Sequence, residues 1–406
     1  MKTEKMMGSG QKKESLATEV ASLFVSNIRD YAMYIALAVI FLIFTITTKG
    51  LFISSRNLIN LVNQTGYVAV LAIGMTLVLI IKHIDLSIGF VAGFLGAVAA
   101  ILLSKGWNVW LVLPTVLACG VLVGVYQGFL VTKIQVPAFV TTLAGMFMFR
   151  GLLSMVTAGT GTIIVRDRVF LQLSNGYIPD LPWGANFDFH LLTLLVGIGL
   201  VVSIIVSQIR HRQSLLRYEF KTNSMPIFVV KQIALSVIVL VITWIMASYR
   251  GIPWTAVIVS VVLLIYNFVL TKTRFGRHVY AIGGNAEAAE LSGIKVNKVT
   301  FLVFSSMGLM AALAGMLYTS RLASATPTAG LGFELDAIAS SYIGGVSVGG
   351  GVGRVTNTII GALVIMSLTN GMNLLGVDIS FQYVVKGAIF VLAVAFDVTT
   401  RKRAKA

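Results

Sequence analysis

The 406 residues are 57% hydrophobic and only 11% charged, whereas an ordinary soluble domain carries about 25% charged residues. So few charges cannot cover a water-facing surface, so we expect lipid to be the solvent for most of this chain. The net charge of +16 does not indicate nucleic acid, because Lys and Arg lie in short clusters between apolar runs, as in loops that fix membrane orientation. Cys119 is the single cysteine, which excludes a disulfide within the chain.

The chain opens with a polar tail, residues 1–30, that runs into an apolar segment without a small-residue cleavage site. We interpret it as a cytoplasmic N-terminal tail and not as a removed signal peptide. A bilayer core about 30 Å thick needs about 20 helical residues, and lipid-exposed backbone must satisfy its hydrogen bonds internally. The sequence therefore predicts an all-α polytopic transmembrane bundle of about 12 spans. The apolar runs are 31–48, 66–81, 86–104, 109–132, 138–158, 190–209, 227–247, 253–271, 299–320, 335–351, 355–374 and 380–398.

Basic residues suggest the orientation of these spans. They cluster before the first span, after the sixth, after the eighth and in the tail 399–406. Counting crossings from an inside N-terminus places all four clusters in the cytoplasm, provided that 335–351 crosses fully. We therefore expect both termini, including the basic tail 399–406, to be cytoplasmic. Lys49, Arg56, Arg166 and Arg168 fall on the other side and oppose this assignment.

Two irregular stretches have competing interpretations. Residues 159–189 form the longest external loop, which is either a solvated connection or a platform for an extracytoplasmic partner. The glycine-rich GGVSVGGGVGR at 344–354 lacks the Lys-Ser/Thr ending of a phosphate loop, so the chain has no visible nucleotide site. We favour close helix packing through small residues for this run. An irregular element beside a transport pathway is the alternative.

The segment 274–298, RFGRHVYAIGGNAEAAELSGIKVNK, follows the eighth span. Gly283 and Gly284 favour a turn, and Asn285 is a candidate N-cap for a short helix with acidic residues in its first turns. Such a knob on the cytoplasmic side would fit a groove on a moving partner, although an ordinary connecting loop fits the residues equally well. The candidate coupling residues are Gly284, Asn285, Glu287, Ala288, Ala289, Glu290, Ser292 and Gly293. Ala288, Ala289 and Leu291 would form its small apolar side.

GRHVYAIGGNAEAAELSGIKVNKV resembles the EAA-type coupling loop of ATP-binding-cassette (ABC) importer permeases, in the form found in ribose/galactose/xylose-type sugar permeases. The order and spacing of further stretches agree with that family. These are HIDLSIG at 83–89, VPAFVTTLAGMFMFRGL at 136–152, ASATPTAGLGFELDAIASSYIGG at 323–345, NGMNLLGV at 370–377 and QYVVKGAIFVLAVAFDV at 382–398. Typical members are shorter, and the extra length lies around 210–252, where it adds about two spans. This departure resembles longer members of the xylose or multiple-sugar type.

The resemblance implies that 31–398 is the transmembrane permease domain of an importer in the bacterial plasma (inner) membrane. A pentose or hexose would arrive on an extracytoplasmic sugar-binding protein. A separate cytoplasmic ABC ATPase would bind the segment 274–298, with ATP and Mg on that partner. The chain itself would be no enzyme and would bind no cofactor. The transmembrane part of the importer would be a homodimer, formed by this chain and a second copy of it. An ion-coupled secondary carrier, a channel and an ABC permease for branched-chain amino acids are the alternatives.

Polar groups inside the apolar runs are the remaining candidates. Asp85 and Arg150 form a candidate structural ion pair, because a central charge is costly in lipid. Glu334 and Asp336 are candidate caps of the following helix. His190 and His278 lie at span ends without metal-like spacing, so no metal site is assigned. Side chains that could contact sugar along the pathway are Tyr342, Asn370, Asn373, Gln382 and Tyr383.

Overall fold

The computed structural model describes residues 28–159, 161–220 and 224–405. This part of the chain is almost entirely helical, which confirms the all-α prediction. The long helices are α2 (Ile28–Thr47), α3 (Ser55–Ile80), α4 (Ile88–Ser104), α5 (Val109–Thr132), α6 (Ala138–Thr157), α8 (Leu191–Arg217), α9 (Met225–Ala247), α10 (Trp254–Lys272), α13 (Val296–Leu322), α15 (Val355–Leu374) and α16 (Ile379–Lys405). The shorter elements are β1 (Ile163–Ile164), α7 (Arg168–Asn175), the 3-10 helix η1 (Pro182–Asn186), α11 (Arg274–Gly284), α12 (Ala286–Leu291), β2 (Ser324–Ala325) and α14 (Phe333–Ile343).

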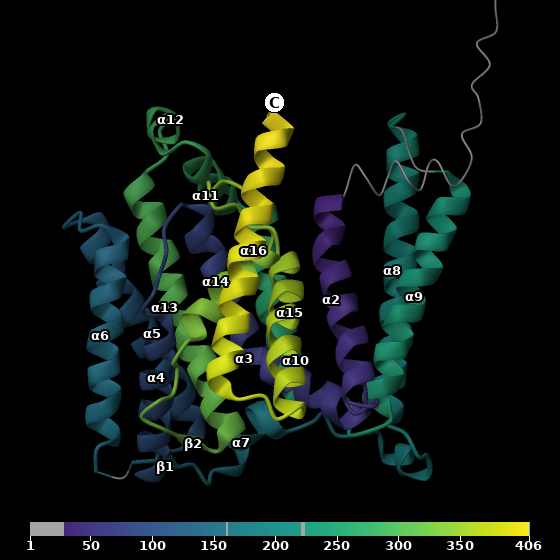
Figure 1. Cartoon of the computed structure of the whole chain (residues 1–406), viewed down its shortest axis with the longest axis horizontal. Coiled ribbons are helices and arrows are strands. Elements are labelled where there is room, and N and C mark those ends of the chain that lie inside the picture. The colour runs from purple at the N-terminus through teal and green to yellow at the C-terminus, as the bar shows by residue number, and fades with distance from the viewer. Residues whose placement is uncertain (1–27, 160, 221–223, 406) are drawn as a thin grey trace, which may run out of the picture.

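The long helices run side by side between two edges of the molecule (Figure 1). We call the edge with α11, α12 and the end of α16 the upper edge, and the edge with β1, β2 and α7 the lower edge. Eight helices in the described residues are long and apolar enough to cross a bilayer, and α2, α4 and α16 contain shorter apolar stretches. The chain is therefore a multi-pass membrane protein. Twelve spans and cytoplasmic termini stay predictions, and most of the tail 1–30 lies outside the described residues.

Several predicted helices end at other residues in the structure, such as α8, which continues to Arg217, and two of the differences bear on the site. α3 begins at Ser55, eleven residues before the predicted start at 66, because the polar stretch SRNLINLVNQT is also helical. The predicted run 335–351 ends as a helix at Ile343, because Gly345, Gly350 and Gly351 adopt φ values of +86°, +72° and +70°, which favour glycine. Residues 344–354 are thus an irregular loop, not a packed helix, and we call them the glycine loop.

The segment around α14 nevertheless runs from one edge to the other. Ala323, at the end of α13, accepts the backbone N–H of Val165 beside the β1–β2 pair at the lower edge. The N–H of Gly351 donates to Ile80 O at the end of α3, next to α11 at the upper edge. This segment reaches from one edge to the other through a turn-rich approach, 326–332, and the eleven-residue helix α14.

The core forms around α3 and α13, which pack against each other and against α4, α5 and α15. Glycines allow these helices to touch backbone to backbone. A Cβ at Gly308 of α13 would lie 2.1 Å from Gly120 O of α5, and one at Gly315 would lie 2.1 Å from Ala92 O of α4. Small residues therefore hold this bundle together through close backbone contact, as membrane bundles generally do.

Helices α8 and α9 form a hairpin at the side of the bundle and pack mainly against each other (Figure 1). Thr243 of α9 fits against Gly197 of α8, where a Cβ would lie 2.2 Å from it. The stretch 210–252, which the sequence suggested as an addition to the family pattern, holds the end of α8, all of α9 and the link to α10.

The stretch 159–189, predicted to be external, folds onto the lower edge. β1 pairs with β2, and Ser174 of α7 donates to Leu317 O of α13 at 2.7 Å. Asp180 accepts the backbone N–H groups of Leu181, Leu191 and Leu192, each at 2.8 Å. Desolvation raises the pKa of this carboxyl, but the three N–H donors and His190 outweigh it, so its pKa lies below the usual range. The stretch is therefore built against the bundle at several points.

Candidate functional site

The predicted coupling residues lie at the upper edge, opposite the stretch 159–189 (Figure 1). The predicted short helix is present as α12, and it is preceded by α11, which was not predicted from the sequence. Asn285 is the N-cap of α12, as predicted, and its Oδ1 accepts Ala288 N–H at 3.0 Å. Gly293 follows at φ +83°, and its N–H donates to Glu290 O at 2.8 Å. The turn chemistry therefore fixes a compact knob.

The exposed surface of this knob differs from the predicted one. Glu287 and Ala288 are exposed, but Ala289 is only 5% exposed and belongs to the core side of α12. Leu291 is 91% exposed, which is the largest value among the exposed large hydrophobic residues described. An apolar side chain held this far out by a capped helix is a candidate docking residue. Leu291 was predicted on the apolar side of the helix but not as a coupling residue.

The knob is joined rigidly to the end of α3. A Cβ at Gly283 would lie 1.9 Å from Ile80 O and 2.5 Å from Gly351 N, so only glycine fits there without a shift of backbone. Lys82 Nζ donates to Gly284 O at 3.2 Å. α11, the end of α3 and the glycine loop therefore meet at one point, which we call the upper junction.

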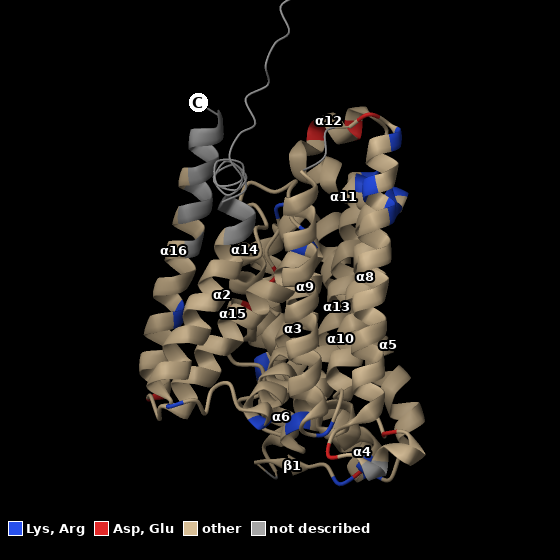
Figure 2. Cartoon of the chain, turned by 90° about the vertical axis from the view of Figure 1, so that its right-hand side faces the viewer, with Lys and Arg blue, Asp and Glu red and all other residues tan. Residues whose placement is uncertain are grey.

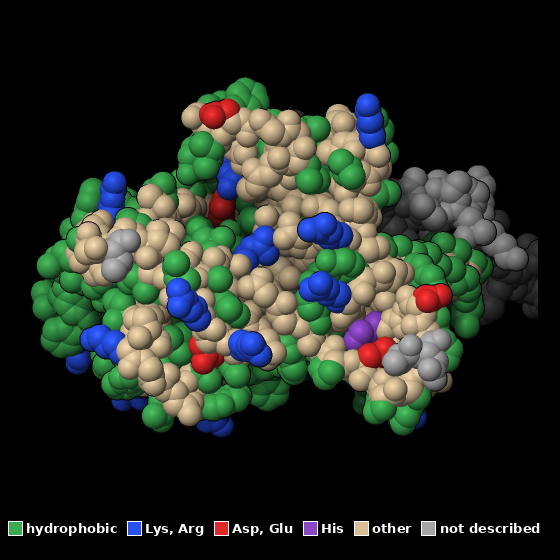
Figure 3. Space-filling view, turned by 90° about the horizontal axis from the view of Figure 1, so that it is seen from below, with side chains coloured by type: hydrophobic (Ala, Val, Ile, Leu, Met, Phe, Trp, Pro, Cys, Tyr) green, Lys and Arg blue, Asp and Glu red, His purple; other side chains and the backbone are tan. Residues whose placement is uncertain are grey.

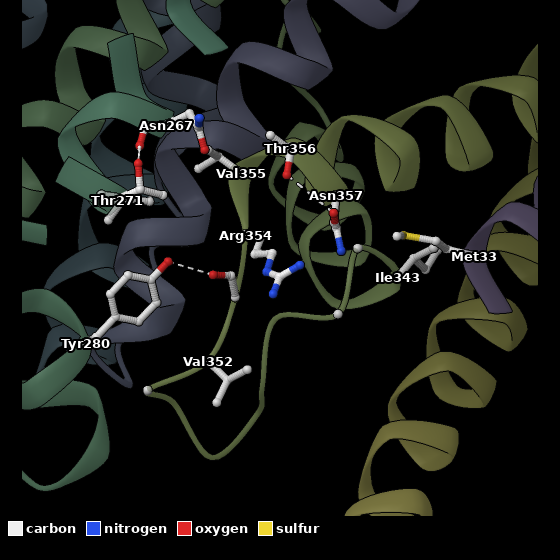
Figure 4. A pocket seen from close by; sticks show the side chains of 15 residues that line it. Met33, Asn267, Thr271, Tyr280, Ile343, Val352, Arg354, Val355, Thr356 and Asn357 are labelled. Carbon is white, nitrogen blue, oxygen red and sulfur yellow. Dashed lines mark hydrogen bonds between the residues drawn. The ribbon is translucent and has the colours of Figure 1, made fainter. Parts of the chain in front are cut away.

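A cavity of about 410 Å³ lies beside the upper junction (Figure 4). Tyr280 of α11 donates its hydroxyl to Gly353 O at 2.7 Å, which ties α11 to the glycine loop a second time. The Arg354 side chain extends into the cavity between Tyr280 and Met33. Acidic residues lie on α12, with basic residues close by along the chain (Figure 2). The upper edge thus carries charged residues at α12 and a cavity between α11 and the glycine loop.

A second cavity of about 320 Å³ lies between α14, α15 and α16, and we call it the inner cavity. Lys386 of α16 donates to both carboxylate oxygens of Asp336 of α14, at 3.0 and 3.1 Å. Tyr67 and Phe333 add two mutually tilted aromatic rings, with centroids 4.8 Å apart, to the wall. Carboxylate, ammonium, amide and aromatic groups together can bind the hydroxyls and the C–H face of a small polar molecule.

The structure brings three of the predicted pathway residues into the inner cavity. Asn373, Gln382 and Tyr383 all line it, and Gln382 Nε2 donates to Asn373 Oδ1 at 2.8 Å. Tyr342 does not line it but packs against Phe390, which does, with ring centroids 6.0 Å apart. Asn370 lies outside it and exchanges amide hydrogen bonds with Asn57.

Tyr67, Asp336 and Lys386 line the inner cavity but were not predicted as pathway residues. One signal was present, because Lys386 is a lone cation in the apolar run 380–398, and intramembrane charges usually face a partner or a cavity. Asp336 was predicted as a cap. In the structure Gly332 occupies the cap position of α14 without a side-chain bond, and Asp336 is in the first turn. The capping prediction is therefore wrong for Asp336, and also for Glu334, which lies in the same first turn.

The predicted ion pair between Asp85 and Arg150 is also wrong. Asp85 is 1% exposed and accepts the N–H and the hydroxyl of Ser87, at 2.9 and 2.7 Å. Arg150 is exposed, and its guanidinium lies 5.7 Å from the Phe90 ring centroid. Ser87, two residues after Asp85, packs against Gly145 of α6. Arg150 follows Gly145 by five residues, which places it about 7.5 Å further along the axis of α6. The two charges therefore lie at different depths.

Comparisons with known proteins agree with the resemblance drawn from the motifs. The family model described as "Branched-chain amino acid transport system / permease component" matches residues 57–394. The chain is 40% identical over 378 residues to the xylose transport system permease protein XylH of Escherichia coli (strain K12), covering 93% of each chain. It is 35% identical over 364 residues to the ribose import permease protein RbsC of Haemophilus influenzae, covering 90% of this chain and 91% of the relative.

The xylose transport system permease protein XylH of Haemophilus influenzae is 39% identical over 383 residues, covering 93% of this chain and 98% of the relative. No solved structure matches the chain. The relatives are permease subunits and not enzymes. With most of its length matched by the family model and by these relatives, the chain belongs to this family of transport-system permeases.

Proposed function

We propose that the chain is the transmembrane subunit of an ABC importer that moves a pentose or hexose of the xylose or multiple-sugar type. A binding protein would deliver the sugar to the lower edge, and a separate ATPase would bind the knob at the upper edge. Relatives at 35–40% identity named for xylose and ribose transport support this assignment. The single observation that carries it is the exposed, capped knob with Leu291 at its surface.

The upper junction suggests how ATPase movement would reach the pathway. A force on α12 passes through Gly283 to Ile80 of α3 and to Gly351 of the glycine loop. The glycine loop joins α14 to α15, and both helices line the inner cavity. ATP binding would therefore favour one arrangement of these helices over another, which is what coupling of transport to hydrolysis requires. The orientation of the lower edge outwards, in a bacterial plasma membrane, is part of the proposal.

Two finer points belong to the same proposal. The second half of the importer would be another copy of this chain, as the family resemblance implies. Sugar would pass the inner cavity, where Asp336, Lys386 and Gln382 offer hydroxyl partners beside aromatic rings. A variant with one cysteine per chain could be cross-linked in membranes. A cross-linked species of twice the chain mass, measured on the purified complex, would show the second copy.

Reconstitution with the ATPase and the binding protein tests the coupling assignment. We expect Glu287→Arg and Leu291→Asp to abolish ATP-dependent uptake of labelled xylose and ribose and to weaken ATPase binding. Both side chains are exposed, so the variants should reach the membrane at normal levels. Ala289 is unsuitable for this test, because a bulky residue at a 5% exposed position would also disturb the fold of the knob.

Glu219→Arg is the matched control, because Glu219 is an exposed residue just after the upper end of α8, away from the knob. It should transport normally. Normal ATPase binding and uptake by Glu287→Arg and Leu291→Asp would contradict the assignment. Uptake on a proton or sodium gradient without ATPase or binding protein would favour a secondary carrier instead. Uptake of leucine but of no sugar would favour the amino-acid permease that the family description names.

A further inference from the structure

A third cavity of about 540 Å³ opens near the lower edge, and we call it the outer cavity. It lies where the start of α3, the end of α7, the link from α9 to α10 and the last turns of α13 and α15 converge. Its lining residues are Leu51, Ser54, Arg56, Asn57, Asn60, Asn63, Asn175, Tyr177, Tyr249, Arg250, Arg321 and Leu374. Lys and Arg side chains are spread over the face that surrounds it (Figure 3).

The lining is unusual because it combines three arginines, four asparagines and two tyrosines and contains no carboxylate. Arg321 is held in place by Asn60, with Nη2 2.8 Å from Oδ1. The guanidinium of Arg250 lies 5.8 Å from the Tyr177 ring centroid and 5.5 Å from that of Tyr249. Among the described residues, no ion pair neutralises any of these arginines. Planar donors therefore remain available to a ligand beside aromatic faces.

Asn63 supplies the observation that narrows the ligand class. This side chain is 6% exposed, and its Oδ1 is buried without a hydrogen-bond partner. A buried acceptor without a partner costs free energy and in a native protein usually finds a partner. The partner must donate a hydrogen bond. An ionised carboxylate cannot do so, whereas a hydroxyl group can donate to Asn63 and accept from an arginine.

We propose that the outer cavity is a binding subsite for a neutral polyhydroxylated molecule, a monosaccharide, on its way to the inner cavity. The proposal rests on the proposed function for the direction of transport. Hydroxyl groups of the sugar would bond to Asn63, Arg250 and Arg321, and the C–H face of the ring would lie on Tyr177 or Tyr249. Because this set of side chains supplies both hydrogen-bond donors and an acceptor, the site prefers sugars to simple anions.

The same geometry assigns a role to the added stretch 210–252. Tyr249 and Arg250 follow the end of α9 and form one wall of the outer cavity. Gly251 N–H donates to Met246 O at 3.0 Å, and His190 N–H donates to Ala247 O at 2.9 Å, so this link is fixed to both helices of the hairpin. The α8–α9 hairpin thus completes the subsite and contributes to the choice of sugar.

Direct binding to the purified full-length chain in nanodiscs tests the subsite without ATPase or binding protein. The probes are tritiated xylose and ribose, with acetate, an anion without hydroxyl groups, as the competitor. We expect Arg250→Ala and Asn63→Leu each to weaken sugar binding about tenfold or more, as the loss of about 1.4 kcal/mol would do. Arg217→Ala, at the opposite end of the same hairpin, is the control and should bind like the unchanged chain.

Other outcomes would overturn the proposal. Unchanged sugar binding by Arg250→Ala would do so, and this exposed link residue can be replaced without disturbing the core. A second contrary result would be normal sugar binding by both variants together with weaker docking of the sugar-free binding protein to Arg250→Ala. The arginines would then bind acidic side chains of the binding protein and not a sugar. Displacement of the bound sugar by acetate at the same concentration would indicate an anion site. ATP-driven uptake by the unchanged chain would still support the proposed function in each of these cases.

Discussion

The central helix α3 and the peripheral helix α9 are both apolar and both long enough to cross a bilayer, yet the protein uses them differently. In its most apolar 18-residue window, 89% of α3 is buried inside the molecule, against 6% of α9. α3 contains polar residues such as Asn57 and Thr76 that bond to side chains of α15, whereas α9 presents a wide apolar surface. The less uniformly apolar helix is therefore the buried one.

This difference follows from lipid as the solvent. Lipid tails are as apolar as Leu, so apolar residues gain little by moving from lipid into the bundle, and close packing and hydrogen bonds decide which helices lie inside. α3 carries the hydroxyl of Thr76, which lies 2.8 Å from that of Thr358 of α15. α9 contacts the rest of the bundle chiefly through α8. Apolar content thus identifies a span, and small or polar residues identify its buried side.

A leucine at Gly308 should have the largest effect on folding. A Cβ at this position would lie 2.1 Å from Gly120 O, so α13 and α5 would have to separate along their length. We expect Gly308→Leu to prevent accumulation of folded protein, measured by fluorescence-detected size exclusion of a tagged chain. Gly199→Leu in α8 is the control, because its Cβ has no neighbour within 4 Å. Equal losses in the two variants would remove the distinction between core and hairpin.

The Asp336–Lys386 pair offers a smaller but still large effect. Breaking a fully buried pair on one side leaves an unpaired charge and typically costs about 3–5 kcal/mol, and this half-buried pair should cost less. We expect Asp336→Asn to lower the melting temperature in nanodiscs, and Lys386→Met in the same chain to restore most of it. Uptake should stay low in the double variant, because the inner cavity has then lost both charges. A double variant with normal uptake would show that the pair is only structural.

Asp180 provides an intermediate test at the base of the hairpin. Its lowered pKa means that its N–H bonds stabilise the folded state at pH values above its ordinary pKa, about 3.9, and are lost as pH falls through the lowered value. Hydrogen exchange at Leu191 and Leu192 should therefore be slow at pH 7 and faster, after correction for intrinsic rates, under strongly acidic conditions. Asp180→Asn should show faster exchange at both pH values, and protection unchanged from the natural chain would contradict this role.

Much of the fold could be predicted from the sequence, because apolar runs report directly on lipid-facing helices. α5 was predicted with its observed bounds, Val109–Thr132, and α15 was predicted as 355–374. The errors lie where polar residues are buried in the bundle or where the backbone is irregular. The start of α3 was missed because SRNLINLVNQT is not apolar, and α14 was drawn too long because the glycine loop continues its small-residue composition.

The candidate site could be predicted only in part. Asn285 and Gly293 were found because capping and turn chemistry is local. The upper junction was not, since nothing in a sequence states that Gly283 meets Ile80 and Gly351 across three elements. Asp85 and Arg150 were paired on charge alone, and helix depth separates them. The exposure of Leu291 likewise depends on the three-dimensional position of the knob.

A valine-to-leucine exchange on each of the two helices gives the smallest effect and the sharpest form of the comparison. Val230 of α9 is 66% exposed, while Val78 of α3 is 0% exposed. We expect Val230→Leu to change stability by less than about 0.5 kcal/mol, as for most surface substitutions. Val78→Leu should cost about 1–3 kcal/mol, because an added methylene has no room in a packed core. Both values would come from thermal unfolding in the same lipid. A cost at Val230 as large as that at Val78 would mean that a further protein surface, and not lipid, covers α9.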